Sequence, residues 1–136
     1  MTAITTTEAC AAAEFRAALR QFLRVSERIA RQSNLTPQRY LLLLMVKGAV
    51  DGSERSTVTE LADRMQLAQS TVTELVSRAE EAGLLQREQS NTDARVAHLR
   101  LTDEGERRLM LAFTGISAER ENLRGVFAHL DSRFDD

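Results

Sequence analysis

Small polar and charged side chains gather on one face of a helix predicted around residues 70–81. The apolar face of that helix is set by Val72, Leu75, Val76 and Ala79, which recur at helical spacing. The opposite face is polar throughout and carries Ser70, Thr73, Glu74, Ser77, Arg78 and Glu81. These groups donate and accept hydrogen bonds, but they form no catalytic arrangement. A helix that is small and polar at its exposed N-terminal end suits insertion into the major groove of DNA.

Residues that could support catalysis or bind a metal are sparse elsewhere in the chain. His98 falls on a predicted strand and His129 lies near the C-terminus, and neither has a paired nucleophile or a ligand cluster in the sequence. Cys10 is the single cysteine, which excludes an internal disulfide and a multi-cysteine metal site. The sequence has no glycine-rich phosphate loop. We therefore expect no enzymatic activity, no metal and no cofactor.

A second predicted helix and a hairpin position the polar helix. Thr57 to Glu60 has the capping-box pattern Thr-x-x-Glu, which starts a short helix ahead of a three-residue turn. Gly83 is placed to end the polar helix as a C′ residue. The pattern then alternates over residues 84–89 and 95–101, around turn-forming residues 90–93, and so predicts a β-hairpin. Residues 56–102 are thus predicted to form a helix-turn-helix with a hairpin wing beside it.

Long helices are expected on either side of this region. The first runs from about Glu8 to Ser33, and the second from Pro37 to about Val50, with the apolar run LLLLMV at the centre of the core. A helix from Thr102 to about Leu130 would be roughly 40 Å long at 1.5 Å per residue. One small winged domain cannot cover that length. We therefore expect residues 8–34 and 103–131 to form a dimerisation region with a second copy.

Composition indicates one soluble domain over residues 1–136. The chain is 43% hydrophobic and 28% charged, which is ordinary for a globular protein. Its longest apolar run, Tyr40 to Val46, is far below the roughly 18 residues that span a bilayer. No basic segment followed by an apolar one opens the sequence, so no secretory signal is expected. The expected fold class is mainly α with a small β-hairpin (α+β), in the cytoplasm and without a membrane partner.

Charge is distributed unusually for a DNA-binding protein. The net charge is −2, and residues 59–102 alone hold five basic against seven acidic residues, again a balance of −2. This predicts modest DNA affinity with a shallow salt dependence. On the first helix, by contrast, arginines recur at strict spacing of four, at Arg16, Arg20, Arg24 and Arg28. A solvated surface is the favoured interpretation of that row. The alternative is an electrostatic shelf for phosphates or for an anionic ligand.

Taken together, the motifs resemble those of the MarR/SlyA family of bacterial transcriptional regulators. They are Leu35-Thr36-x-x-x-Tyr40, the run LADRMQLAQSTVTELVSRAEEAGLL, Asp93-x-Arg95, and Leu101-Thr102-Asp103-Glu104-Gly105. The resemblance covers roughly Leu35 to Leu109. It implies a homodimeric winged helix-turn-helix protein that binds a pseudo-palindromic operator in double-stranded DNA. Such proteins usually act as repressors that a small molecule releases.

The resemblance also implies roles for individual residues. On the reading helix, Ser70, Thr71 and Thr73 stand where the family contacts phosphates and base edges. Ser77 lies on the same face, and Arg78 would reach the flanking backbone. Glu74 departs from the pattern, because many relatives carry a basic residue there that reads guanine. A glutamate can instead accept a hydrogen bond from cytosine N4.

On the wing, the resemblance places Arg95 in the minor groove, where a narrow, negative channel attracts a guanidinium. Asp93 matches the acid that orients this arginine. An ion pair at the hairpin tip without any ligand is the alternative for the two residues. The resemblance implies a ligand crevice between the terminal helices and the reading domain, and an arginine facing it would favour a small anionic aromatic effector. Arg16, Arg20 and Tyr40 are the candidate polar groups for such a crevice, although for each of them singly a surface or core-edge position is the favoured interpretation.

Two other functions remain open at the sequence level. A winged helix also serves as a protein-interaction module, and the acidic reading face favours that alternative to strong DNA binding. Cys10 could make the protein a redox-sensing regulator, as in the peroxide-sensing branch of the same family. A lone thiol in an alanine-rich run is usually inert, however, so the redox function is the least favoured.

Overall fold

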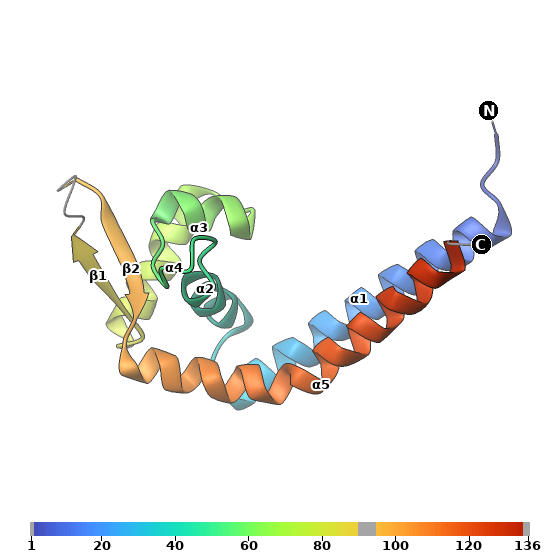
Figure 1. Cartoon of the computed structure of the whole chain (residues 1–136). Coiled ribbons are helices and arrows are strands. Elements are labelled where there is room, and N and C mark those ends of the chain that lie inside the picture. Colours follow the sequence, from blue (N-terminus) through green and yellow to red (C-terminus); the bar gives the residue numbers. More distant parts are fainter. Residues whose placement is uncertain (1, 90–94, 135–136) are drawn as a thin grey trace.

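The computed structural model describes residues 2–89 and 95–134 of the 136-residue chain. Within these residues the elements follow in the order α1 (Thr6–Gln32), α2 (Pro37–Lys47), α3 (Val58–Met65), α4 (Gln69–Glu81), β1 (Leu85–Gln89), β2 (Ala97–Leu101) and α5 (Asp103–Phe134). Helices α2, α3 and α4 and the hairpin form a body, from which α1 and α5 extend as a long arm (Figure 1). The predicted fold class, mainly α with a hairpin wing, is confirmed.

The arm is an antiparallel pair of helices, with both chain ends at its far tip (Figure 1). The rings of Phe15 and Phe127 stack with their centroids 5.0 Å apart. Nearer the body, Gly115 brings the two helices close together, because a Cβ atom there would lie 2.8 Å from Ile29 Cγ2. The side of α1 that carries Phe15 and Ile29 therefore faces α5. No helix among the described residues is long and apolar enough to cross a membrane.

Helix α2 is the centre of the core, as its apolar run predicts. Leu42, Leu43 and Val46 are fully buried. The helix ends at Lys47, three residues before the predicted end at Val50, because Gly48 caps it. Arg64 of α3 then donates hydrogen bonds to the carbonyl oxygens of Met45, at 3.3 Å, and of Gly48, at 2.9 Å. These bonds satisfy backbone acceptors that the end of a helix leaves open.

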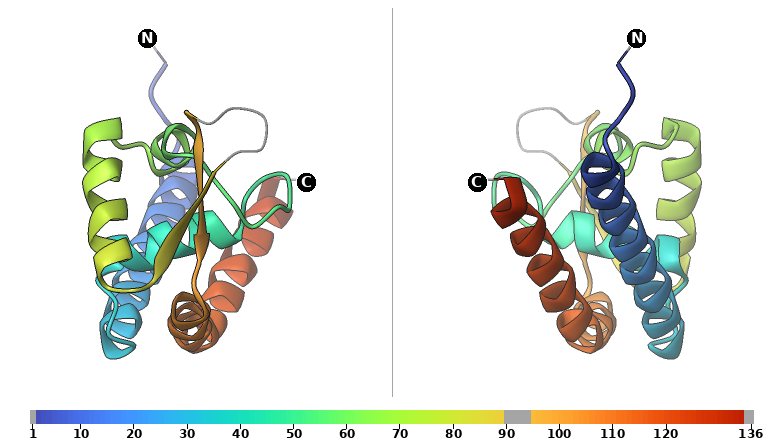
Figure 2. Two further views of the ribbon diagram at one scale, coloured as in Figure 1. Left: turned by 90° about the vertical axis from the view of Figure 1, so that its left-hand side faces the viewer. Right: turned by 90° about the vertical axis from the view of Figure 1, so that its right-hand side faces the viewer.

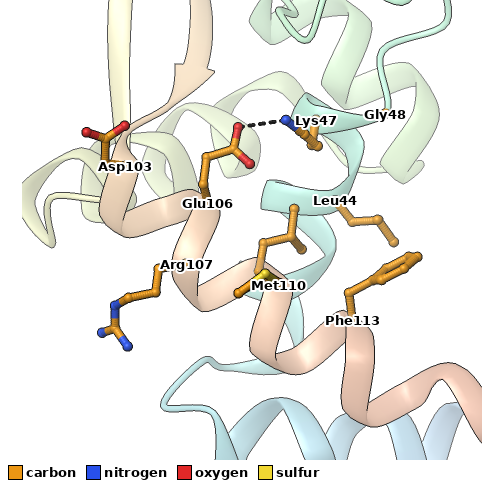
Figure 3. Close-up of a pocket in the computed structure, with 9 residues that line it drawn as sticks. Leu44, Lys47, Gly48, Asp103, Glu106, Arg107, Met110 and Phe113 are labelled. Atoms are coloured by element: carbon orange, nitrogen blue, oxygen red, sulfur yellow. Dashed lines mark hydrogen bonds and ion pairs between the residues drawn. The ribbon is translucent and has the colours of Figure 1, made fainter.

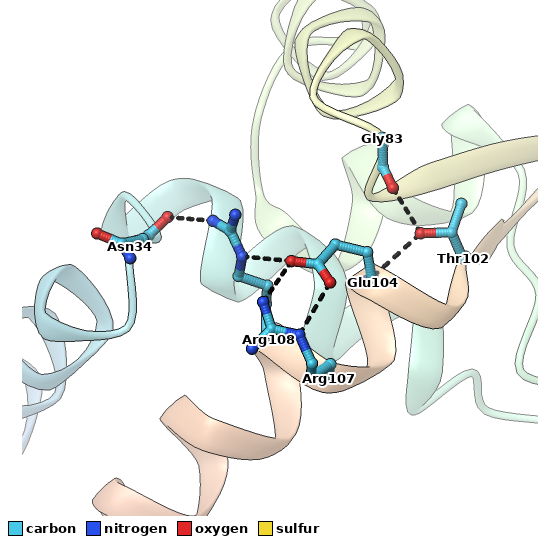
Figure 4. A network of polar contacts seen from close by, with 7 residues as sticks. Asn34, Gly83, Thr102, Glu104, Arg107 and Arg108 are labelled. Carbon is cyan, nitrogen blue, oxygen red and sulfur yellow. Dashed lines mark hydrogen bonds and ion pairs between the residues drawn. The ribbon is translucent and has the colours of Figure 1, made fainter.

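A network of polar contacts joins the start of α5 to the body (Figure 4). Thr102 accepts a hydrogen bond from the Gly105 amide and donates one of 2.6 Å to the Gly83 carbonyl oxygen. Glu104 forms ion pairs with Arg107 and Arg108. Arg108 also donates to the Asn34 carbonyl oxygen, in the turn between α1 and α2. The motif at residues 101–105 is therefore the junction between the arm and the body.

Candidate nucleic-acid interface

Helices α3 and α4 form the predicted helix-turn-helix. Thr57 caps α3 with both bonds of a capping box: its amide donates to Glu60 over 2.9 Å, and its hydroxyl accepts from the Glu60 amide over 3.2 Å. The turn is three residues long, as expected, and Gln66 adopts a left-handed conformation in it with φ of 56°. Leu67 in this turn packs against the core. The corner thereby fixes the angle at which α4 leaves the body.

Helix α4 separates its two faces as predicted. Val72, Val76 and Ala79 are fully buried, and Leu75 packs against the core. The polar residues of the other face are all exposed, namely Ser70, Thr71, Thr73, Glu74, Ser77, Arg78 and Glu81. Gly83 has a φ of +77°, which fits the predicted C′ position. The structure thus brings all the predicted reading residues of α4 onto one open surface.

That surface carries less free charge than its residue types indicate. The guanidinium of Arg78 lies 2.6 Å from the carboxylate of Glu74, one turn away on the same helix. Both side chains are exposed, so the pair stabilises the helix little. Its consequence is electrostatic, since Arg78 is already partnered before any phosphate approaches. The sequence shows the spacing of four residues, but only the structure shows the pair formed.

The wing is a two-stranded antiparallel sheet in which Leu85 pairs with Leu101 and Gln89 with Ala97. Leu99 and Leu101 are buried and Ala97 is half-buried, so these alternate residues share the inward face of β2. A further pairing was not predicted from the sequence: Ser56 bridges the outer edge of β2 through two backbone hydrogen bonds with Leu99. Ser56 shows no alternating pattern that could have signalled this contact.

Arginines of the wing strands also have carboxylate partners. Glu88 accepts hydrogen bonds from Arg100 at 3.0 Å and from Arg55 at 3.2 Å. Both bonds lower the pKa of Glu88, and the bond from Arg100 has the larger effect. Arg87 pairs with Glu80 at the end of α4. Arg95 is exposed. Asp93, predicted to orient it, lies outside the described residues.

A pocket of about 290 Å³ lies where α1, α2 and α5 meet. Tyr40 lines it, and so does Arg120, whose guanidinium sits 3.7 Å from the centre of the Phe113 ring. Burial raises the pKa of Tyr40, and the nearby charge and hydrogen bond of Arg120 offset this only in part. The buried hydroxyl of Ser26 lines the same pocket and has no hydrogen-bond partner among the described residues. Arg120 was not among the ligand residues predicted from the sequence.

The other predicted ligand residues lie elsewhere. Arg16 and Arg20 line a separate depression of about 320 Å³ along α1, which Tyr40 does not reach. Cys10 is an exposed free thiol near the tip of the arm. The structure therefore groups Tyr40 with Arg120 and Ser26 rather than with the two arginines.

A larger pocket, of about 600 Å³, lies between α2 and α5 (Figure 3). It shares Leu44 and Phe113 with the pocket of Tyr40. At its rim the ammonium of Lys47 pairs with Glu106 at 2.8 Å and with Glu54 at 3.1 Å, which raises the pKa of Lys47. Leu44, Leu109, Met110 and Phe113 form the apolar part of this pocket, so the two pockets adjoin through shared apolar residues.

Comparison with known proteins supports the same architecture. The model of the MarR family matches residues 33–96. No curated protein matches the chain. Among solved structures, AbsC, a MarR family transcriptional regulator from Streptomyces coelicolor, is 23% identical over 96% of this chain and 84% of its own, with a TM-score of 0.73.

Two further structures are similar. The YusO protein from Bacillus subtilis is 25% identical over 88% of each chain, with a TM-score of 0.64. Sco3205, a MarR family transcriptional regulator from Streptomyces coelicolor solved in complex with DNA, is 23% identical over 90% of this chain and 77% of its own, with a TM-score of 0.70. The likeness extends beyond the family-model segment and includes the arm.

Proposed function

We propose that this chain is a MarR-family transcriptional regulator that binds double-stranded DNA as a homodimer, in keeping with the family-model match over residues 33–96 and the winged-helix fold that it shares with AbsC. The observation that carries the proposal is the face of α4, where seven polar side chains are exposed beside a hairpin wing. Ser70, Thr71 and Thr73 lie at its N-terminal end, from which helix-turn-helix proteins reach base edges. Under this proposal Arg78 reaches the flanking backbone, with Ser77 on the same face of α4, and Arg95 enters the minor groove with Asp93 to orient it. Glu74 faces a base edge.

Similar proteins support DNA as the partner. Sco3205 was solved in complex with DNA, and a MarR variant from E. coli with operator DNA. These complexes concern those proteins, so they support the present proposal by likeness. The composition of α4 supports it independently, since hydroxyls and a guanidinium on an exposed helix are groups that bind phosphates and base edges.

Dimerisation is proposed from the apolar surface beside the arm. Large apolar side chains of α1 and α5 are 42 to 61% exposed, namely Phe15, Leu23, Met110, Leu111 and Phe113, and three of them, Leu23, Met110 and Phe113, line the two pockets. Soluble monomers rarely leave such groups clustered in water, so we propose that a second copy covers them. A twofold pair of winged heads would read half-sites about 34 Å apart, which makes the operator pseudo-palindromic.

We propose that the protein acts as a repressor and that a small aromatic anion releases it from DNA. The pocket of Tyr40 is the proposed site. It offers apolar walls for a ring, the guanidinium of Arg120 for an anionic group, and the unpartnered hydroxyl of Ser26. The pocket adjoins α5, so a bound ligand would shift the helix that joins the arm to the helix-turn-helix and the wing.

Selection of bound sequences from a random DNA pool tests the proposed function. The expected result is an enriched pseudo-palindrome with half-sites about 10 base pairs apart. Arg95→Ala should then weaken binding to that sequence roughly tenfold or more. Arg124→Ala is the matched control, because Arg124 is an exposed arginine on α5 that pairs with Glu121 far from the reading head. A pool without enrichment after repeated rounds refutes sequence-specific reading.

Effector binding has its own test. Titration calorimetry with benzoate, as a simple aromatic anion, should show binding that Arg120→Gln weakens about tenfold to a hundredfold, the loss expected for a hydrogen bond to a charged group. Arg124→Gln, one turn further along α5, should bind as the wild type does. Equal affinity of both variants would remove Arg120 from the site.

A protein-interaction module is the second candidate function. The observation that favours it is the pairing of Arg78, Arg87 and Arg100 with glutamates, which leaves the reading module poor in free positive charge. The random-pool selection separates the two, because an interaction module would enrich no DNA sequence.

A further inference from the structure

Five arginines line one face of α1, and we call them the arginine row. They are Arg16, Arg20, Arg24, Arg28 and Arg31, and each is exposed. Among the described residues, none of their guanidinium groups forms an ion pair or a hydrogen bond. Glu27 is the one acidic residue between the ends of the row. The row therefore holds four net positive charges within a protein whose net charge is −2.

Most arginines elsewhere in the described residues behave differently, with the exception of the half-buried Arg39 on α2, whose guanidinium forms no hydrogen bond or ion pair with them. Partners of their guanidinium groups are carboxylates or carbonyl oxygens, and this holds for Arg55, Arg64, Arg78, Arg87, Arg100, Arg107, Arg108, Arg120 and Arg124. Free guanidinium charge is thus concentrated on α1 in the described part of the chain. A row that merely solvated the surface would not require this segregation.

The arginine row faces away from α5. Helix α1 packs on α5 through Phe15, Phe22 and Ile29. At 3.6 residues per turn, the centre of the row lies roughly half a turn from these residues. Seen along the axis of Figure 2, α1 lies on the same side of α5 as α4, while Figure 1 shows that the arm leads away from the body. The outward face of α1 is therefore turned toward the side of the molecule on which α4 lies.

The geometry of the row suits a chain of phosphates. Residues four apart in a helix are about 6 Å apart along its axis, so Arg16 to Arg28 extend over about 18 Å. Depressions of about 320 and 680 Å³ lie between the side chains, and Arg20 and Arg24 line both. The planar guanidinium fork binds phosphate oxygens in pairs, and it gives up less hydration than an ammonium does.

We propose that the arginine row is a second, sequence-independent contact with the DNA phosphate backbone. The inference rests on the proposed DNA binding and assigns a new surface to it. Phosphate neutralisation supplies most non-specific affinity, yet the arginines on α4 and on the wing strands are already paired with glutamates. The arginine row supplies the charge that the reading module lacks. It holds the backbone beside the site that α4 reads.

The test compares two double variants with equal changes in charge. Arg20→Gln with Arg24→Gln removes the centre of the row, and Arg107→Gln with Arg124→Gln removes two exposed arginines of α5. Binding to the selected operator and to a random duplex is measured by fluorescence anisotropy between 50 and 200 mM salt. Loss of two phosphate contacts should reduce the slope of log K against log salt by about 1.8 in the row variant. The α5 variant should keep the wild-type slope.

The row variant should lose affinity for the operator and for the random duplex by the same factor, because phosphate contacts carry no sequence information. The single variant Arg16→Gln, expected to lower the slope by about 0.9, serves if the double variant fails to fold. Unchanged slopes in both row variants overturn the proposal, and poly-glutamate capture by the wild type would then identify an acidic polypeptide as the partner. If the wild-type protein binds every duplex equally and the row variant loses that binding, sequence-specific reading is refuted and the phosphate contact of the row stands. Absence of any DNA binding refutes both.

Discussion

Gly105 is the position at which one methyl group should have the largest effect on the junction between the arm and the body. The residue is buried at the start of α5, and a Cβ atom there would overlap the carbonyl oxygen of Leu84. That oxygen also accepts the Thr102 amide at 3.1 Å. Both sides of the contact are backbone, so neither can turn away. Gly105→Ala must therefore displace the first turn of α5 from the body.

The magnitude follows from two opposing terms. Overpacking in a core costs about 1–3 kcal/mol, and a clash between backbone atoms belongs at the upper end. Alanine favours the helical state over glycine by about 1 kcal/mol. We therefore expect Gly105→Ala to lower the free energy of unfolding by about 2 kcal/mol. For a chain of this length that is roughly 6–10 °C in Tm.

Gly125→Ala is the matched control on the same helix. A Cβ atom at Gly125 meets nothing within 4 Å, so only the helix-propensity gain remains. This variant should be more stable than the wild type, by up to about 1 kcal/mol. Both are measured by urea unfolding at one protein concentration, because any association adds to apparent stability. A Gly105→Ala protein as stable as the Gly125→Ala protein would refute the close-approach argument.

Three further predictions concern charge and buried polarity. Hydrogen bonds from Arg107 and, to a smaller extent, Arg108 lower the pKa of Glu104 to about 2. The carboxylate therefore stabilises the fold above its unfolded pKa near 4.5, and this stabilisation is lost as the pH falls toward 2. Glu104→Gln should flatten the dependence of Tm on pH between those two values. Glu74→Gln should free Arg78 for phosphate and steepen the salt slope of DNA binding by about 0.9, and an unchanged slope would exclude Arg78 from the backbone contacts. Ser26→Ala should raise stability by up to about 1 kcal/mol in urea unfolding, because it removes a buried hydroxyl without a partner; a loss of stability would mean that the hydroxyl is satisfied.

The elements of this fold are encoded locally, and for that reason they could be predicted. The period of Val72, Val76 and Ala79 sets the buried face of α4 with no reference to the rest of the chain. Thr57 and Glu60 are three residues apart and complete their capping box within one turn. Information of this kind lies inside a window of about a dozen residues, which is the range over which periodicity acts.

Contacts between distant segments could not be predicted in the same way. The apolar pattern of α2 continues through Ala49 and Val50, yet Val50 is 88% exposed because the helix has already ended. Its end depends partly on Arg64, which satisfies the last carbonyl oxygens from another helix. Arg120 enters the pocket of Tyr40 from 80 positions along the chain. Neither arginine differs in local sequence pattern from a solvated one, so only the packed structure reveals its role.

Segregation of free and paired arginines has a consequence for specificity under the proposed function. A guanidinium held by a carboxylate, as Arg78 is by Glu74, exchanges it for a phosphate or base only where the new acceptor is at least as well placed. Reading by α4 would then depend on close geometric fit and add little affinity for arbitrary DNA. The arginine row lies on a helix that belongs to the arm and not to the helix-turn-helix, so it cannot distinguish sequences. Substitutions in the row should therefore shift affinity for all duplexes together, whereas substitutions on α4 should change the ratio between operator and random DNA. If substitutions in the arginine row also changed the ratio between operator and random DNA, α1 would have to contribute to sequence recognition. The proposed division of roles between α1 and α4 would then be wrong.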